Sequence, residues 1–266
     1  MSPMKYSAML ELIRQNKPLV HHITNYVTVN DCANITLCIG ASPVMSYAWE
    51  EVEEMVGHAG ALVLNIGTLD PYQAKSMLLA GHAANKFDIP VIVDPVGTGA
   101  TRYRTDFMSR LVAEIRISVI KGNAGEIGML AGADAHVRGV DSGDVKGDLR
   151  GIAQDFALKT GITTVISGPT DIVSDGSRVI TVENGHPMMG RISGTGCMLT
   201  SIIASFAAVQ RDMAEASTAS LAAFGIAGEL AAANTSGFGS FKTALFDYLS
   251  LLTPAELARD AKIRIL

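Results

Sequence analysis

A turn rich in glycine and hydroxyl residues stands directly before a long apolar segment in the last third of the chain. It contains Gly194, Thr195 and Gly196, and Cys197 follows it. The backbone N–H groups of such a turn and the positive end of the helix that follows can bind an anion such as a phosphate. The turn lacks the Gly-Lys-Ser/Thr of a Walker A loop and the glycine spacing of a dinucleotide site. Taken alone, it is equally compatible with a helix start that binds nothing.

Two carboxylates follow apolar runs that have the pattern of strands. Asp94 ends the run before Pro95, and Glu126 stands three residues after Asn123 in a segment that predicts a helix start. Ligands of α/β proteins bind at the carboxyl ends of parallel strands, and magnesium needs only one or two carboxylates. Each acid also has an ordinary alternative. An Asp before Pro often caps a turn, and a Glu in a first helical turn stabilises the helix dipole.

Cys197 and Lys121 are two further residues that could do chemistry. A thiol at a helix N-terminus can have a lowered pKa, and the thiolate could accept the proton of an alcohol. Lys121 follows a predicted strand, where its ammonium could neutralise phosphates. Most free cysteines, however, are small buried hydrophobes, and most lysines are solvated at the surface. The residues alone leave both alternatives open.

The elements that must position these residues alternate between short apolar runs and longer helical patterns. The runs predict strands at residues 61–65, 90–93, 118–120 and 163–167. The spacing of apolar residues predicts helices at 71–85, 106–114, 124–130 and 145–160. This alternation predicts an α/β fold, with βαβ units that form a mostly parallel central sheet flanked by helices on both faces. Functional residues are then expected at the carboxyl ends of the strands.

The two ends of the chain depart from this alternation. Residues 1–17 predict an amphipathic helix. The apolar runs 172–173 and 178–182 flank an Asp-Gly pair, which predicts an antiparallel hairpin. From residue 194 almost to the C-terminus the sequence predicts Ala-rich helices that need other helices or subunits to bury them. Because no linker or repeat divides the chain, residues 1–266 are expected to form a single domain.

The composition restricts the classes of partner. With 266 residues and a formal charge of −5, the chain has no clustered positive field for nucleic acid or for an anionic membrane. Three cysteines, Cys32, Cys38 and Cys197, are too few for a disulfide framework and suit a cytoplasmic protein. The apolar stretches 197–209 and 219–233 are too short for a membrane span, or are interrupted by Glu229. A small-molecule partner is therefore expected.

Five segments, in chain order, resemble the hydroxyethylthiazole kinase family of the ribokinase-like kinases. They are residues 21–27 (HHITNYV), 41–45 (ASPVM), 94–97 (DPVG), 120–126 (IKGNAGE) and 194–197 (GTGC). Ribokinase-like kinases usually end the last motif in Asp, and the Cys variant is similar to hydroxyethylthiazole kinases in particular. The resemblance implies a ribokinase-like fold. It also implies that ATP and Mg²⁺ are used to phosphorylate the hydroxyl of 4-methyl-5-(2-hydroxyethyl)thiazole for thiamine biosynthesis or salvage.

The resemblance and the residue types together define an expected site. The expected ATP contacts are Lys121, Asn123, Ser167, Thr195 and Gly196. The expected substrate contacts are Asn25, Met45 and Gly194. Asp94 and Glu126 are expected to bind magnesium, and Cys197 and Asp94 are the expected catalytic residues. Arg191 could also reach a phosphate, and His21 and His22 are expected to be structural or pocket-lining. The resemblance further implies a homotrimer with active sites at the subunit interfaces.

Alternative functions from two classes remain open. Kinases of hydroxymethylpyrimidine or pyridoxal, and a dehydratase that repairs hydrated nicotinamide cofactors, are related to the family, but they keep Asp where this chain has Cys197. A nucleotide-binding protein without turnover would be expected to have lost Asp94, Glu126 or the glycines, and all of them are present. One departure from the family is Gly125, a poor helix former that weakens the expected helix start there.

Overall fold

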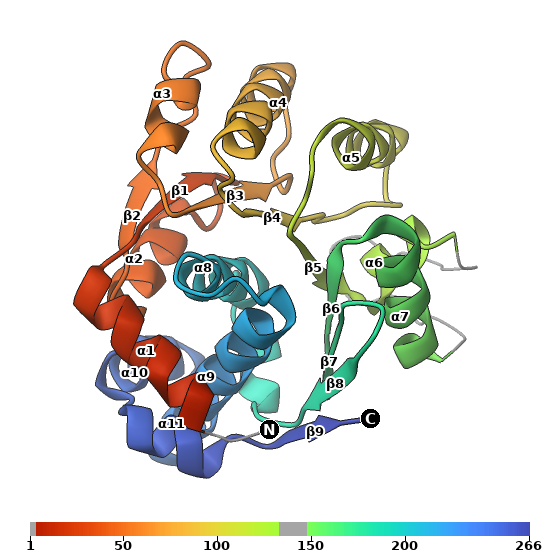
Figure 1. The fold of residues 1–266 in the computed structure, drawn as a ribbon. Coiled ribbons are helices and arrows are strands. Elements are labelled where there is room, and N and C mark those ends of the chain that lie inside the picture. The colour runs from red at the N-terminus through yellow and green to blue at the C-terminus, as the bar shows by residue number, and fades with distance from the viewer. Residues whose placement is uncertain (1–3, 133–147) are drawn as a thin grey trace.

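The structure is a computed structural model that describes residues 4–132 and 148–266. The described strands form one sheet of nine, in the order β2-β1-β3-β4-β5-β6-β7-β8-β9 (Figure 1). The strands from β2 to β6 are parallel and the last three are antiparallel. The bounds are β1 Leu19–Ile23, β2 Ser42–Met45, β3 Ala61–Asn65, β4 Val91–Asp94, β5 Val119–Asn123, β6 Thr163–Ser167, β7 Asp171–Ser174, β8 Val179–Val182 and β9 Ile263–Ile265.

Helices cover both faces of this sheet. The helices are α1 Met4–Asn16, α2 Val29–Ile39, α3 Val52–Gly57, α4 Pro71–Lys86, α5 Arg102–Glu114, α6 Ala124–Leu130, α7 Leu149–Thr160, α8 Thr195–Ala207, α9 Met213–Asn234, α10 Phe238–Leu251 and α11 Pro254–Asp260, with a 3-10 turn η1 at Pro187–Arg191. Figure 1 shows α3, α4 and α5 on one face and α8, α9 and α1 on the other. Side chains alternate between two cores: Val63 of β3 packs with the α8 side, and Leu64 with the α4 side. The predicted mostly parallel, two-faced α/β fold is confirmed.

The predicted central strands correspond to β3, β4, β5 and β6, and the predicted hairpin to β7 and β8. Two helix starts differ from the prediction because capping residues define them. Helix α5 begins at Arg102 rather than at 106, since the Thr101 hydroxyl accepts a hydrogen bond from Arg104 N. Helix α7 begins after Asp148, which caps it, and residues 145–147 lie outside the described part of the chain.

Helix α9 forms the centre of the core on one face of the sheet. It has 22 residues, and by length and composition it is the one helix in the described residues that could cross a membrane. The helix at Met213–Asn234 is therefore longer than the apolar stretch 219–233 identified in the sequence. Its most apolar window is 78% buried, and it packs against α8, α10 and α1. This burial is that of a core helix, and it takes place within the chain rather than against another subunit.

The topology brings the expected functional segments to one edge of the sheet. Helix α8 crosses β1, β3 and β4, and its N-terminus lies at their carboxyl ends. The register pairs Asn65 with Asp94 and Asn123 with Ser167. Because all these strands run in the same direction, the polar residues that end them meet at the same edge. All the described strands belong to one sheet, and the single domain stays a prediction.

Candidate active site

The turn before α8 has a backbone that only glycine tolerates. Gly194 has φ +93°, and a Cβ added there would lie 2.6 Å from Cγ2 of Thr28. Gly194 is the N-cap of α8 and supplies no side-chain cap. The N–H groups of the first helical turn therefore have no capping side chain and remain available to an anion. A Cβ at Gly196 would lie 3.1 Å from Nζ of Lys121, so this glycine also gives the ammonium room.

Asp94 is buried at the carboxyl end of β4, with 1% of its surface exposed. Its Oδ2 accepts hydrogen bonds of 2.9 Å from Asn65 Nδ2 and from Thr200 Oγ1. Lys121 Nζ lies 3.5 Å from the same oxygen. Among the described residues these bonds all fall on Oδ2, which leaves Oδ1 for a ligand. The side chain thus connects β3 and α8 rather than capping the turn that follows.

Lys121 lies inside the site and not at the surface. Its side chain is 3% exposed, and Nζ donates a 3.0 Å hydrogen bond to the carbonyl of Gly196. Burial acts to lower the pKa of Lys121, but the nearby acidic groups, Asp94 first among them, outweigh burial and raise it. The ammonium is therefore held charged at the start of α8. The alternative of a solvated surface lysine is wrong.

Glu126 is the third residue of α6 and is buried beside the same edge, with 4% of its surface exposed. It forms a capping box with Asn123: Glu126 Oε2 accepts from Asn123 N, and Asn123 Oδ1 accepts from Glu126 N, both at 2.9 Å. The other oxygen, Oε1, accepts from Gly97 N at 2.9 Å. The acid therefore does cap a helix, and α6 begins at Ala124 despite Gly125. Burial and the charge of Asp94 raise the pKa of Glu126.

The two acids fit a magnesium ion that keeps its own water. The described residues contain no group of three or more His, Cys, Asp or Glu placed to hold a metal. Magnesium needs no such cage, because it takes one or two carboxylates and completes its octahedron with water and phosphate oxygens. Asp94 offers Oδ1 directly. Both oxygens of Glu126 already accept backbone N–H groups, so contact through water suits it better.

Cys197 is the third residue of α8 and is partly buried against two asparagines. Its sulfur lies 3.3 Å from Nδ2 of both Asn25 and Asn65. The expectation of a lowered thiol pKa is wrong for this structure. Burial and then the nearby carboxylate of Asp94 raise the pKa of Cys197, although Lys121, Thr28 and Asn65 act in the opposite direction. The thiol is therefore protonated before any ligand binds.

The amides of Asn25 and Asn65 have their orientations fixed by neighbouring donors. Asn65 Oδ1 accepts from Asn25 Nδ2 at 3.0 Å and from Gly67 N at 2.9 Å. Asn25 Oδ1 accepts from the backbone and the hydroxyl of Thr28. Each amide nitrogen must therefore point one N–H at the sulfur of Cys197. Asn25, expected to bind substrate, is instead already engaged with protein groups, although it does lie beside the thiol.

Asn65 and Thr200 belong to the site but were not predicted from the sequence. Asn65 ends a buried apolar strand, which is the same signal that identified Asp94, and the sheet register places the two side by side. Thr200 stands one helical turn after Gly196, so its hydroxyl also reaches Asp94. Within β1, His21 and His22 are buried as expected, and burial lowers the pKa of His22 to about 4. A ring nitrogen of His21 bonds to the Ser46 carbonyl, and those of His22 to the Val20 carbonyl and the Ser201 hydroxyl; their structural or pocket-lining role stays a prediction.

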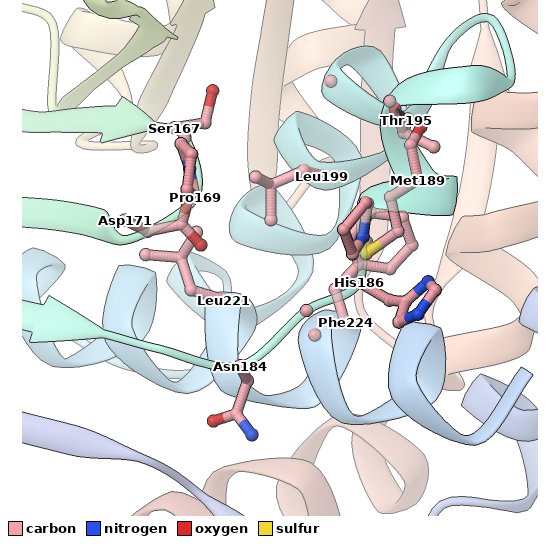
Figure 2. Close-up of a pocket in the computed structure, with 16 residues that line it drawn as sticks. Ser167, Pro169, Asp171, Asn184, His186, Met189, Thr195, Leu199, Leu221 and Phe224 are labelled. Atoms are coloured by element: carbon pink, nitrogen blue, oxygen red, sulfur yellow. Dashed lines mark hydrogen bonds between the residues drawn. The ribbon is translucent and has the colours of Figure 1, made fainter. Parts of the chain in front are cut away.

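A cavity of about 460 Å³ opens beside the start of α8 (Figure 2). Its walls come from the β6–β7 turn, the segment 184–190, α8 and α9. Three of the expected ATP contacts, Ser167, Thr195 and Gly196, line it. Leu199, Leu221 and Phe224 make much of the wall apolar, as suits a planar base. The cavity is therefore an apolar recess with Gly196 in its wall, and the carbonyl of Gly196 accepts the hydrogen bond from Lys121.

One expected and one possible site residue lie elsewhere. Met45 lines a different cavity, together with Tyr26, Tyr47 and Tyr72. The guanidinium of Arg191 stacks on Phe238, with 5.3 Å from its Cζ to the ring centre, rather than meeting the buried charges. The other two cysteines pack as expected: Cys32 is buried and Cys38 is partly buried against the core.

Comparisons with known proteins agree with this geometry. The model of the hydroxyethylthiazole kinase family matches residues 10–255. The chain is 57% identical over 258 residues to the hydroxyethylthiazole kinase of Methanocella arvoryzae, with 97% of each chain covered. It superposes on the structure of the hydroxyethylthiazole kinase protein of Pyrococcus horikoshii with a TM-score of 0.91, at 37% identity, covering 98% and 99% of the two chains.

A more distant structure shares the fold alone. A ribokinase-like superfamily protein of Enterococcus faecalis superposes with a TM-score of 0.63 at 16% identity, covering 93% of this chain and 95% of its own. The fold is thus ribokinase-like. Because the family model spans most of the chain and a relative of nearly equal length is 57% identical, this chain belongs to the hydroxyethylthiazole kinase family.

Proposed function

We propose that the chain transfers the γ-phosphoryl group of ATP to the hydroxyl of 4-methyl-5-(2-hydroxyethyl)thiazole, for thiamine biosynthesis or salvage. One observation carries the proposal. Lys121 Nζ lies 3.5 Å from Asp94 and 3.0 Å from the Gly196 carbonyl, so a buried cation joins the glycine turn to the carboxylate at the mouth of a nucleoside-sized cavity. A triphosphate is the ligand that suits such a junction.

The protein groups then act by position and charge. The N–H groups of the turn at 194–197 and the ammonium of Lys121 stabilise the charge that spreads over the transferring phosphoryl group. Ser167, Thr195 and Gly196 line the path of the nucleotide, and Asn123 orders the start of α6 beside it. Asp94 and Glu126 would hold Mg²⁺, which when bound neutralises phosphate charge. All these groups are already in place and need little reorganisation.

The acceptor hydroxyl is placed beside Cys197, on the side of Asn25 and Gly194. In its thiolate form, whose fraction increases with pH because the pKa of Cys197 is raised, the sulfur accepts the hydroxyl proton as the new P–O bond forms and the bond to ADP breaks. Two N–H donors on the sulfur, from Asn25 and Asn65, favour its anionic form against burial and Asp94. A modest base is sufficient, because the transition state of phosphoryl transfer is loose and catalysis depends mainly on positioning.

Met45 can contact the thiazole only if the substrate pocket extends into the cavity that Met45 lines with Tyr26, Tyr47 and Tyr72. We propose that the pocket extends in this way in a cytoplasmic homotrimer whose active sites lie at the subunit interfaces. The support is a set of exposed apolar side chains: Val27, two residues after Asn25, is 71% exposed, and Leu37 on α2 and Phe238 on α10 are also exposed. Sedimentation of the free chain as a monomer at micromolar concentration would contradict the trimer.

The function is tested by ADP release with Mg²⁺ and hydroxyethylthiazole, hydroxymethylpyrimidine or pyridoxal in parallel. Selective turnover of the thiazole alcohol is expected. Selective turnover of either of the other two would replace the proposed substrate. ATP binding without ADP release for any of the three would support a nucleotide-binding protein without turnover.

A further inference from the structure

The carboxyl group of Asp171 lies in the wall of the nucleotide cavity and has no role in the proposed phosphoryl transfer. Asp171 is the first residue of β7, and its Oδ1 accepts a 2.9 Å hydrogen bond from Gly168 N. Among the described residues this is its only hydrogen bond, and no Lys, Arg or His forms an ion pair with it. Figure 2 shows a carboxyl oxygen directed into the cavity. The protein thus leaves part of this acceptor group unused.

This placement works against stability. Burial raises the pKa of Asp171 to about 7, and the Gly168 N–H and the charge of Lys121 oppose that rise only in part. Asp171 is partly buried, and a partly desolvated carboxyl with one partner costs free energy of folding, so carboxyl groups are usually exposed or paired. Such groups in a cavity are candidates for contact with a ligand. The ligand would supply the donors that the protein does not.

The position of Asp171 along the cavity indicates which part of a bound nucleotide its carboxyl group contacts. Figure 2 shows Ser167, at the end of β6, and Thr195, in the α8 turn, toward one end of the cavity and Asn184 toward the other, with Asp171 at an intermediate level. In Figure 2 the Asp171 side chain lies beside Leu221 and apart from Thr195 at the start of α8. A nucleotide with its phosphates at the α8 turn places its ribose next and its base in the apolar recess. The donors at the middle position are the ribose hydroxyls.

We propose that Asp171 is a nucleotide-selecting residue whose carboxylate accepts hydrogen bonds from the 2′- and 3′-hydroxyls of the ATP ribose. The inference rests on the proposed binding of ATP in this cavity. A carboxylate is an acceptor only, and its two oxygens match the spacing of two neighbouring hydroxyls. The chain then favours ribonucleotides over deoxyribonucleotides. Triphosphate contacts alone would not distinguish the two.

The test compares ADP with 2′-deoxy-ADP and 3′-deoxy-ADP in equilibrium binding, and the matching triphosphates in turnover. For the unsubstituted chain, each deoxynucleotide is expected to bind about 10-fold more weakly, as for the loss of one hydrogen bond to a charged group. In D171A the Kd of ADP should rise to that of the deoxynucleotides, with kcat changed less than KM. D171N, which keeps the size and one acceptor oxygen, should show an intermediate preference. D106N, at an exposed position on α5, should leave every ratio unchanged.

The outcomes separate the inference from the proposed function. Equal binding of ADP and 2′-deoxy-ADP by the unsubstituted chain, or an unchanged preference in D171A, overturns the ribose contact even if thiazole turnover is normal. A change in the preference for ATP over ITP instead would place Asp171 on the base and also overturn it. Because the binding measurement needs no turnover, a lost preference in D171A supports the contact even if no alcohol is phosphorylated.

Discussion

Asn65 Nδ2 and Cys197 Sγ are joined by a 3.3 Å hydrogen bond across the gap between β3 and α8. The other N–H of the same amide points to Asp94 Oδ2 at 2.9 Å. One side chain therefore sets the distance between the expected magnesium carboxylate and the expected proton acceptor. Its donor to the sulfur opposes the rise in the thiol pKa that burial and Asp94 cause.

Replacing Asn65 by Leu, which has a similar shape and no donor, should lower kcat about 10-fold with little change in the KM for ATP. The pKa of Cys197 should rise further, because one N–H donor to its anionic form is lost. The rate of alkylation of the thiol by iodoacetamide, measured against pH, reports that pKa directly. N234A, at the exposed end of α9, is the control. An alkylation profile unchanged in N65L would contradict the assigned role.

Cys197 itself should tolerate replacement by a stronger base. C197D is expected to keep or raise turnover, and C197A to lower it without abolishing it, because positioning supplies most of the rate. Since the thiol pKa is raised above its usual value, kcat of the unsubstituted chain should still be rising near pH 9. C197D should reach its plateau at lower pH. Equal turnover in all three proteins would refute a base role.

Lys121 should be needed for both stability and phosphate binding. In K121M the buried carboxylates of Asp94 and Glu126 lose their cation, and the unfolding free energy should fall by about 3 kcal/mol. The KM for ATP should rise and kcat should fall about 100-fold, as for a lost charge on the transferring group. Urea unfolding and steady-state kinetics measure the two effects, and K159M, at an exposed position of α7, is the control. Normal kinetics in K121M would remove the lysine from the phosphate site.

Asp171 should make stability depend on pH. Between its ordinary value of 3.8 and about 7, the unfolded chain carries this carboxylate charged while the folded chain keeps it protonated. The contribution of the Asp171 carboxyl to the unfolding free energy is therefore present at low pH and is lost as pH rises from about 3.8 to about 7. The D171N side chain does not ionise, so D171N does not lose this stability. Its unfolding free energy should match that of the unsubstituted chain near pH 4 and exceed it at pH 8 by about 1–3 kcal/mol. Parallel urea titrations at the two pH values test this, and equal stability at pH 8 would argue against the buried carboxyl.

The sequence predicted the centre of the sheet better than its edges. Strands β3 and β4 are apolar up to their last residue and are buried on both faces, and that pattern is explicit in the residues. The sequence analysis did not predict β1 or β2 as strands. Two histidines interrupt β1, and Pro43 lies in β2, which an edge position permits. Strand β9, three residues long, is formed by pairing with β8 rather than by local preference.

The sequence predicted part of the candidate site, because some of its residues follow recognisable strands and others are brought to the site only by tertiary contacts. Asp94 and Glu126 could be located because each follows a recognisable strand. Asn65 and Thr200 join Asp94 only through sheet register and the turn of α8, which no local pattern contains. The thiol pKa of Cys197 was predicted in the wrong direction because burial and the distance to Asp94 are tertiary properties. Local spacing therefore indicates candidates, and packing determines their charge.

The most direct test of the account is the structure of the chain with a non-hydrolysable ATP analogue, Mg²⁺ and hydroxyethylthiazole. It should place the γ-phosphate within hydrogen-bond distance of the N–H groups at 194–197 and of Lys121. The acceptor hydroxyl should face Cys197, and Asp94 and Glu126 should lie on the metal side. A triphosphate bound away from this turn, with either acid directed elsewhere, would contradict the account.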